Sequence, residues 1–119
     1  MRLNKREVGA SHEKLAGAYL ETQGYLILEY NFRSRRSEID IVARDGEYLV
    51  FVEVKYRSDE RNGDPLEAVD VRKQKRICQA ARYYLMIHHL NMDTPCRFDV
   101  AAVRGQKVEL VKNAFYYIE

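Results

Sequence analysis

The sequence is poor in the features that mark several large classes of protein. It has only two cysteines, Cys78 and Cys96, far apart and without a CxxC pair, which argues against a disulfide scaffold and against a cysteine-type zinc site. No run of apolar residues is long enough for a membrane-spanning helix. The first eight residues mix basic and acidic side chains with no apolar run behind them, unlike a secretory signal. These absences together predict a protein of the reducing cytoplasm.

Linkers and a strong charge imbalance are also missing. Proline occurs only at Pro65 and Pro95, and no repeat or low-complexity tract divides the 119 residues, so a single domain over residues 1–119 is expected. A content of 46% hydrophobic and 32% charged residues is typical of a folded globular protein. The net charge is only +2, so any role in binding nucleic acid must depend on local arrangement.

Hydrophobic periodicity and turn residues predict seven elements. Helices are expected over residues 8–23 and 65–89, the second with Pro65 in its first turn and Asp64 as N-cap. Strands are expected over residues 25–32, 38–44, 47–57, 97–104 and 107–112. The order α-β-β-β-α-β-β indicates an α/β fold with a central mixed sheet flanked by helices.

A hairpin is predicted between the second and third strands, because Asp45-Gly46 suits a type I′ turn, in which both central residues need positive φ. Such a turn places Arg44 opposite Glu47, and it places Glu38 opposite Glu53. Side chains alternate along a strand, so one face of this hairpin is expected to be acidic and the other apolar. The acidic face would carry Glu38, Asp40, Glu53 and Lys55. The core face would carry Ile39, Ile41, Val50, Val52 and Val54.

Carboxylates crowded on one face repel one another, which requires a compensating charge. One interpretation is a divalent cation, since Mg²⁺ prefers oxygen ligands and usually takes one or two carboxylates. In the other, Glu38 splays into water while Lys55 and Arg57 neutralise the rest. Glu13 also has two possible interpretations, one in which it belongs to the acidic site and one in which it does not. It shares a helical stripe with small residues and so faces the sheet, or it is an exposed acid stabilised by the helix dipole.

The acid on the first helix, the Asp on a strand and the Glu-x-Lys on the next strand resemble the pattern of the restriction-endonuclease-like, PD-(D/E)xK nuclease superfamily. More closely, the chain is similar to the uncharacterised bacterial YraN-like family, which is related to archaeal Holliday-junction resolvases. The resemblance covers nearly the whole chain. Its segments are GASHEKLAGAYLETQGY, ILEYNFR, SEIDIVARDGEYLVFVEVKYR, GDPLEAVDVRKQKRI and RFDVAAV.

This resemblance implies a restriction-endonuclease-like fold and a nuclease that hydrolyses DNA phosphodiester bonds with Mg²⁺ or Mn²⁺, with branched or damaged DNA as candidate substrates. It implies that Asp40, Glu53 and the backbone carbonyl of Val54 hold the metal. Lys55 would orient the attacking water, and Glu13 would lie beside the metal, directly or through water. The alternatives are a nucleic-acid-binding protein of the same fold with little or no cleavage activity, and a protein–protein adaptor.

Basic residues near the expected site would suit a phosphate backbone, although interleaved acids also fit an ordinary solvated surface. The candidates for nucleic-acid binding are Arg33, Arg35, Arg36, Arg57 and Lys73. Two further expectations concern the C-terminal third. Asp99 is expected to be a structural acid paired with Arg97 or a helix. The aromatic residues 115–117 are expected to dock on the body of the protein, with a homodimer contact as the alternative.

Overall fold

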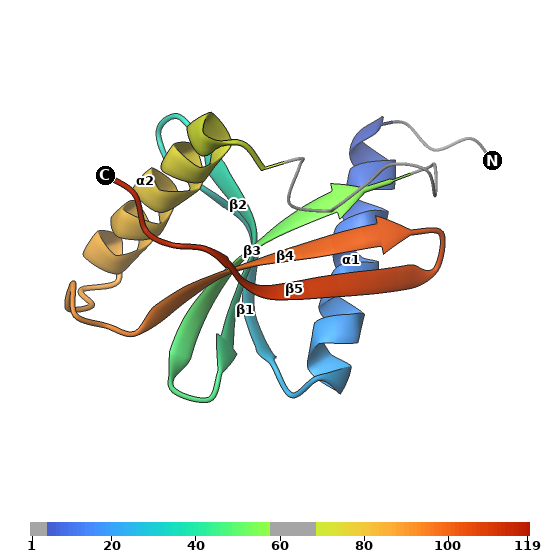
Figure 1. The fold of residues 1–119 in the computed structure, drawn as a ribbon, viewed down its shortest axis with the longest axis horizontal. Coiled ribbons are helices and arrows are strands. Elements are labelled where there is room, and N and C mark those ends of the chain that lie inside the picture. The colour runs from blue at the N-terminus through green and yellow to red at the C-terminus, as the bar shows by residue number, and fades with distance from the viewer. Residues whose placement is uncertain (1–4, 58–68) are drawn as a thin grey trace.

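The computed structural model describes residues 5–57 and 69–119, and its seven elements follow the predicted order (Figure 1). They are α1 (Lys5–Thr22), β1 (Leu26–Arg33), β2 (Glu38–Asp45), β3 (Tyr48–Tyr56), α2 (Val71–Ile87), β4 (Cys96–Arg104) and β5 (Lys107–Phe115). The mixed α/β architecture expected from the sequence is confirmed. Over the ranges covered, neither helix is long and apolar enough to cross a membrane.

The five strands form one sheet in the order β1-β2-β3-β4-β5. Three of the four neighbouring pairs are antiparallel, and β3 and β4 are parallel. A parallel pair needs a crossover connection, and α2 lies within it. The sheet is therefore mixed, and β1 and β5 form its edges.

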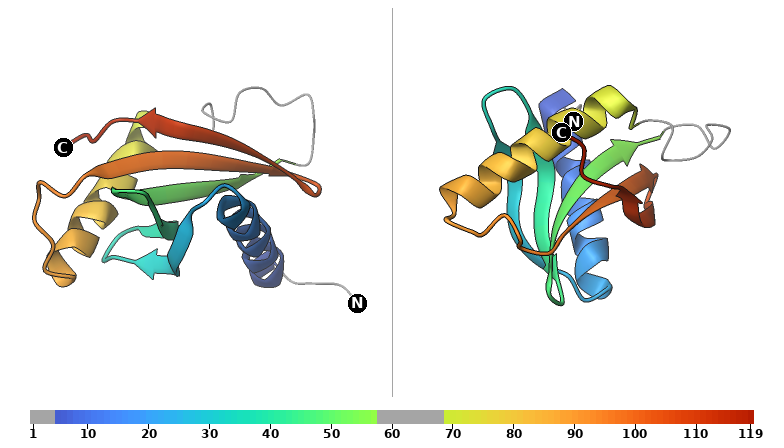
Figure 2. Two further views of the ribbon diagram at one scale, coloured as in Figure 1. Left: turned by 90° about the horizontal axis from the view of Figure 1, so that it is seen from below. Right: turned by 60° about the vertical axis from the view of Figure 1, so that its left-hand side comes forward.

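The two helices cover opposite faces of the sheet. Val42 and Phe51 belong to one core cluster with buried residues of α2, whereas Ile41 and Val52 belong to a second cluster with buried residues of α1. Neighbouring residues of a strand point to opposite faces, so each cluster fills one side. In the right-hand view of Figure 2, α2 crosses in front of the sheet and α1 lies behind it.

Helix α1 lies close to the sheet because of a glycine on its inner side. Ala16 and Leu20 are fully buried against the sheet. Gly17 lies against Tyr30 of β1, and a Cβ atom at Gly17 would overlap the tyrosine hydroxyl and come within 2.9 Å of its Cζ. A larger residue at this position would push α1 away from β1.

The turn between β2 and β3 lies one residue later than predicted. Asp45 pairs with Tyr48, so the turn consists of Gly46 and Glu47. Gly46 has φ +60°, as the first central position of a type II′ turn requires, and Glu47 is not among the residues with positive φ. Each residue of β2 therefore lies opposite a residue of β3 that is two positions later than predicted. Arg44 pairs with Leu49, so the predicted pairing of Arg44 with Glu47 is wrong.

Helix α2 begins later than predicted. Asp70 has extended backbone angles, and its side chain accepts a hydrogen bond of 2.8 Å from the backbone N–H of Lys73, as an N-cap does. The helix ends at Ile87. The proposed first turn at Pro65 and the proposed cap Asp64 lie outside the described residues. A helix running without interruption over residues 65–89 is nevertheless wrong, because the chain is extended at Asp70.

Candidate active site

The strands β2 and β3 separate at one end of their ladder, and a carboxylate lies in the opening. Their pairing runs from Asp45 opposite Tyr48 to Ile41 opposite Val52. Beyond that point the backbone N–H of Val54 donates a hydrogen bond of 2.8 Å to Oδ2 of Asp40. Extending this register by one pair brings Asp40 opposite Glu53. The side chain of Asp40 thus takes the place of a strand-to-strand bond.

The regular alternation of β2 breaks at Asp40. Ile39 packs in the core cluster beneath α2, whereas Ile41 packs in the cluster beneath α1. The prediction that both isoleucines lie on one core face is therefore wrong. On the neighbouring strand, Asn31 lies level with Asp40 and has φ +56°. Positive φ is uncommon for residues other than glycine but is tolerated by asparagine. Both strands thus depart from regular geometry at the level of the acid.

Glu53 is buried, and two lysines face it. It is 5% exposed, and its Oε1 lies 3.6 Å from Nζ of Lys55 and 3.5 Å from Nζ of Lys73. Lys55 comes from the same strand, whereas Lys73 comes from the first turn of α2. A buried carboxylate is costly without such partners. Lys73, predicted as a nucleic-acid-binding residue, forms this ion pair inside the site.

Asp40 is held mainly in its protonated form by its surroundings. Burial raises its pKa to about 8, together with the negative charges of Glu53, Glu13 and Glu38, against the opposing hydrogen bond from Val54. An opposite charge close by would have lowered this pKa. The negative charge around Asp40 is therefore only partly compensated by the protein.

Glu13 of α1 reaches the same place from the other side. With the amide of Asn31 oriented to donate, its nitrogen lies 2.6 Å and 3.1 Å from the two carboxylate oxygens of Glu13. Burial and the charge of Glu38 raise the pKa of Glu13, and Glu53 adds to the effect. We call the group of Glu13, Asp40, Glu53 and Lys55 the acidic centre. Asn31 supports it and was missed in the sequence, where only an asparagine within an apolar strand could have signalled it.

The predicted basic residues divide into different environments. Arg33 forms an exposed ion pair of 3.4 Å with Glu38. The backbone N–H of Arg57 bonds to the carbonyl of Val103, and its Nε is buried with no hydrogen-bond partner in the part of the chain that the structure covers. Arg35 and Arg36 are exposed in the loop between β1 and β2. The loop arginines are thus available to a ligand, whereas Lys73 is engaged with Glu53.

A second buried carboxylate lies in β4, and its partners match its charge. Asp99 is fully buried and accepts hydrogen bonds from the hydroxyl of Tyr25 (2.6 Å), from the guanidinium of Arg97 (two of 2.9 Å) and from the backbone N–H of Asn113 (2.9 Å). Arg97 also bonds to Asp45 at 2.9 Å. We call these five residues the Asp99 network. The expectation of a structural acid paired with Arg97 is confirmed.

The donor chemistry of the acidic centre suits a hard divalent cation. Over residues 5–57 and 69–119, no three Asp, Glu, His or Cys side chains converge as a ready-made metal site. Mg²⁺ does not require one, because it usually binds one or two carboxylates and keeps several waters and phosphate oxygens. Asp40 and Glu53, with the adjacent carbonyl of Val54, are donors of this kind. A cation there would also relieve the repulsion that raises the pKa of Asp40.

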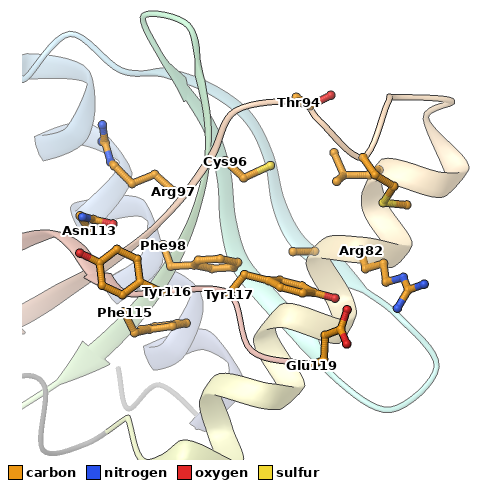
Figure 3. A pocket seen from close by; sticks show the side chains of 13 residues that line it. Arg82, Thr94, Cys96, Arg97, Phe98, Asn113, Phe115, Tyr116, Tyr117 and Glu119 are labelled. Carbon is orange, nitrogen blue, oxygen red and sulfur yellow. The ribbon is translucent and has the colours of Figure 1, made fainter.

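A separate cavity of about 430 Å³ lies between α2, β4 and the C-terminal tail, and no residue of the acidic centre lines it (Figure 3). Phe115 is buried and stacks on Phe98 with ring centroids 5.0 Å apart, and the N–H of Ile118 contacts Sγ of Cys78 at 3.4 Å. Tyr116 and Tyr117 are exposed at its mouth. Of the three aromatic residues expected to dock, Phe115 does so.

Comparison with known proteins places the chain among proteins without an assigned activity. The model of a family described as "Uncharacterised protein family UPF0102" matches residues 12–103. A UPF0102 protein of Lachnoclostridium phytofermentans is 50% identical over 113 residues, covering 95% of this chain and 96% of its own. A UPF0102 protein of Desulforapulum autotrophicum is 46% identical over 119 residues, covering 97% and 98%. A third, from Thermodesulfovibrio yellowstonii, is 44% identical over 110 residues, covering 92% and 96%.

Proposed function

Since the chain belongs to the uncharacterised protein family UPF0102, we propose from the geometry of the acidic centre that it is a divalent-metal-dependent nuclease that hydrolyses phosphodiester bonds of DNA. The family match confirms the uncharacterised bacterial family that the sequence resembles. The family description states no activity. Membership of the nuclease superfamily, the metal and the substrate therefore belong to the proposal.

The observation that carries the proposal is the surplus of negative charge where β2 and β3 separate. Asp40 lies there beside Glu53, with a pKa raised to about 8 by burial and by the surrounding carboxylates. An acid with a structural role has its charge matched by the fold, as Asp99 does. Carboxylates whose charge is left unmatched, beside a lysine, are typical of a site completed by a bound cation.

In this proposal Asp40, Glu53 and the carbonyl of Val54 hold Mg²⁺ or Mn²⁺. When bound, the ion supplies a stabilising charge for the phosphoryl oxygens and makes a coordinated water easier to deprotonate. Asp40 must release its proton to act as a ligand, so metal binding is coupled to proton release. The hydrogen bond from Val54 holds its carboxylate in position between the strands.

Lys55 and Glu13 act on the reacting water. The ammonium of Lys55, 3.6 Å from Glu53, is a compact positive charge that orients the water and offsets charge on the phosphate. The water oxygen forms the new bond to phosphorus, and the bond from phosphorus to the leaving sugar oxygen breaks. The raised pKa of Glu13 suits it to receive the proton that the water loses, and solvent protonates the leaving oxygen.

A cleavage assay tests the proposal directly. The protein would be incubated with Mg²⁺ or Mn²⁺ and linear duplex, single-stranded, flapped and four-way DNA. Asp40→Asn and Lys55→Ala would run in parallel, with Asp93→Asn as a control at an exposed acid. We expect metal-dependent strand cleavage by the parent and the control. Each site variant should lose at least about 100-fold in rate.

Two results would contradict the proposal. If none of the four DNA forms is cut under either metal, the nuclease assignment is wrong. If Asp40→Asn cleaves at the rate of Asp93→Asn, the activity does not arise at the acidic centre. Metal-independent DNA binding without cleavage would favour the alternative of a nucleic-acid-binding protein on this fold.

A further inference from the structure

A small hollow lies between the β1–β2 loop and the exposed side of α2. Its volume is about 160 Å³, and it is lined by Ser34, Arg35 and Arg36 of the loop and by Gln79 and Tyr83 of the helix. Pockets that enclose drug-sized ligands are roughly 300–1,000 Å³. The hollow therefore suits one ring system with an attached charged group and not a larger molecule.

The walls of this hollow are held in place by hydrogen bonds. The backbone N–H and the hydroxyl of Ser34 both donate to the carbonyl of Ser37, at 2.8 Å and 3.0 Å. The hydroxyl of Ser37 donates to the carbonyl of Arg76 at 2.8 Å, which fastens the loop to α2. A site formed in advance costs little conformational entropy when a ligand binds.

The side chains around the hollow match the parts of a nucleotide. Neither Arg35 nor Arg36 has a carboxylate partner within the chain segments that the structure describes, and a guanidinium group binds phosphate through two parallel hydrogen bonds. Tyr83 is 39% exposed, and its ring lies against Phe32 with centroids 6.0 Å apart. A fixed aromatic ring is a stacking platform for a base. The amide of Gln79 can donate to a base edge and accept from it.

The hollow continues toward the acidic centre. A neighbouring depression of about 430 Å³ shares its three loop residues and extends to Arg33 and Glu38. On α2, Lys73 contacts Glu53, and Tyr83 lies farther along the same helix. The two depressions together therefore extend from Tyr83 along the loop to Glu38, which lies two residues before Asp40 on β2.

We propose that this hollow binds one unpaired nucleotide of a DNA strand whose backbone continues along the loop to the acidic centre. The base would stack on Tyr83, and its phosphate would bind Arg35 and Arg36. A base within a duplex already has both faces stacked, so only an unpaired or displaced nucleotide fits. This inference rests on the proposed function and narrows its substrate to DNA in which unpaired nucleotides adjoin a duplex.

The test is a binding measurement that involves no cleavage. Fluorescence anisotropy in EDTA would compare a blunt duplex with the same duplex carrying a short unpaired end. Tyr83→Ala would be compared with Tyr83→Phe, which keeps the ring, and with Tyr48→Ala, a matched control because Tyr48 is also 39% exposed. Thermal melts would verify that each variant is folded.

We expect the parent to bind the duplex with the unpaired end about tenfold more tightly than the blunt duplex. Tyr83→Ala should lose this preference while keeping its affinity for the blunt duplex, and the other two variants should retain the preference. Replacing both Arg35 and Arg36 by Gln should lower the affinity for the unpaired end and flatten its salt dependence.

Equal affinity of the parent for the two duplexes would overturn the inference, as would a preference that survives in Tyr83→Ala. Cleavage plays no part in this measurement. A preference for unpaired ends in a protein that never cuts DNA would refute the nuclease and support the nucleotide site. Cleavage of DNA without any preference for unpaired ends would support the nuclease and refute the nucleotide site.

Discussion

Two groups of acids each contain one buried carboxylate, that of Glu53 in the acidic centre and that of Asp99 in the Asp99 network, and their surroundings differ in one respect. In the Asp99 network, the carboxylate of Asp99 receives hydrogen bonds from a tyrosine, an arginine and a backbone N–H, and the arginine also binds Asp45. In the acidic centre, Asp40 accepts a hydrogen bond from the backbone N–H of Val54 and lies among further acids. If both acids served only to stabilise the fold, each would be expected to have hydrogen-bond and charge partners within the chain. The difference supports the proposal that a ligand completes the acidic centre, whereas the chain itself completes the Asp99 network.

The largest expected effect comes from the same substitution made in both places. Asp99→Asn turns an oxygen that accepts two bonds into a donor facing the guanidinium of Arg97, and it should cost about 3–5 kcal/mol of unfolding free energy. Asp40→Asn keeps an oxygen for the N–H of Val54 and replaces a carboxyl group that is mainly protonated below its pKa of about 8, so stability in EDTA should be unchanged or higher. Urea unfolding of both variants would measure the two costs. A clear loss of stability in Asp40→Asn would mean that Asp40 is a structural acid too.

A smaller effect should come from adding metal. A cation that binds only the folded state at a concentration about 100 times its dissociation constant stabilises it by about 2.7 kcal/mol, which raises the melting temperature by several degrees. The parent should therefore melt higher in Mn²⁺ than in EDTA, and Asp40→Asn should lose this shift. Glu109→Gln, an exposed acid on β5, is the control that should keep it. Equal shifts in all three proteins would place the binding site elsewhere.

The Asp99 network should also be sensitive to the loss of a single hydroxyl group. Tyr25 donates to Asp99 at 2.6 Å and accepts from Arg97 at 2.7 Å. Because both partners are charged, Tyr25→Phe should cost about 1.5–2 kcal/mol of unfolding free energy. Tyr30→Phe is the matched control, since the hydroxyl of Tyr30 lies against Gly17 outside this network, and it should cost less. Similar costs for the two variants would show that the network contributes little to stability.

Much of the fold and part of the acidic centre could be predicted from local patterns. The element order follows from periodicity and turn residues, and it matches the structure. The predicted turn lies one residue earlier than the turn at Gly46 and Glu47, yet Asp40 and Glu53 still lie close enough for the charge of Glu53 to raise the pKa of Asp40. Moving a two-residue turn by one position changes the sum of opposed residue numbers by two, which keeps the parity of the two strands.

The remaining features depend on geometry that no local pattern encodes. Strand alternation assumes a regular strand, so it could not show that Ile39 and Ile41 lie in different core clusters. The pairing of Lys73 with Glu53 depends on how α2 docks on the sheet, because these residues come from separate elements. The signal for Asp70 as N-cap was present, but Pro65 favoured an earlier helix start.

The parent and Asp40→Asn should also differ in how their stability responds to pH in EDTA. The ordinary pKa of an aspartate is 3.8, and burial with neighbouring carboxylates raises that of Asp40 to about 8 in the folded protein. Between these values the folded state binds a proton that the unfolded state has lost, so stability falls as pH rises. Asparagine does not titrate, and every other group is common to both proteins. From about pH 5 to about pH 8 the parent should therefore lose stability relative to Asp40→Asn, by up to about 1.4 kcal/mol per pH unit, as measured by urea unfolding. If the difference between the parent and Asp40→Asn stays constant or reverses with rising pH, then Asp40 is compensated as Asp99 is, and the contrast between the two acids disappears.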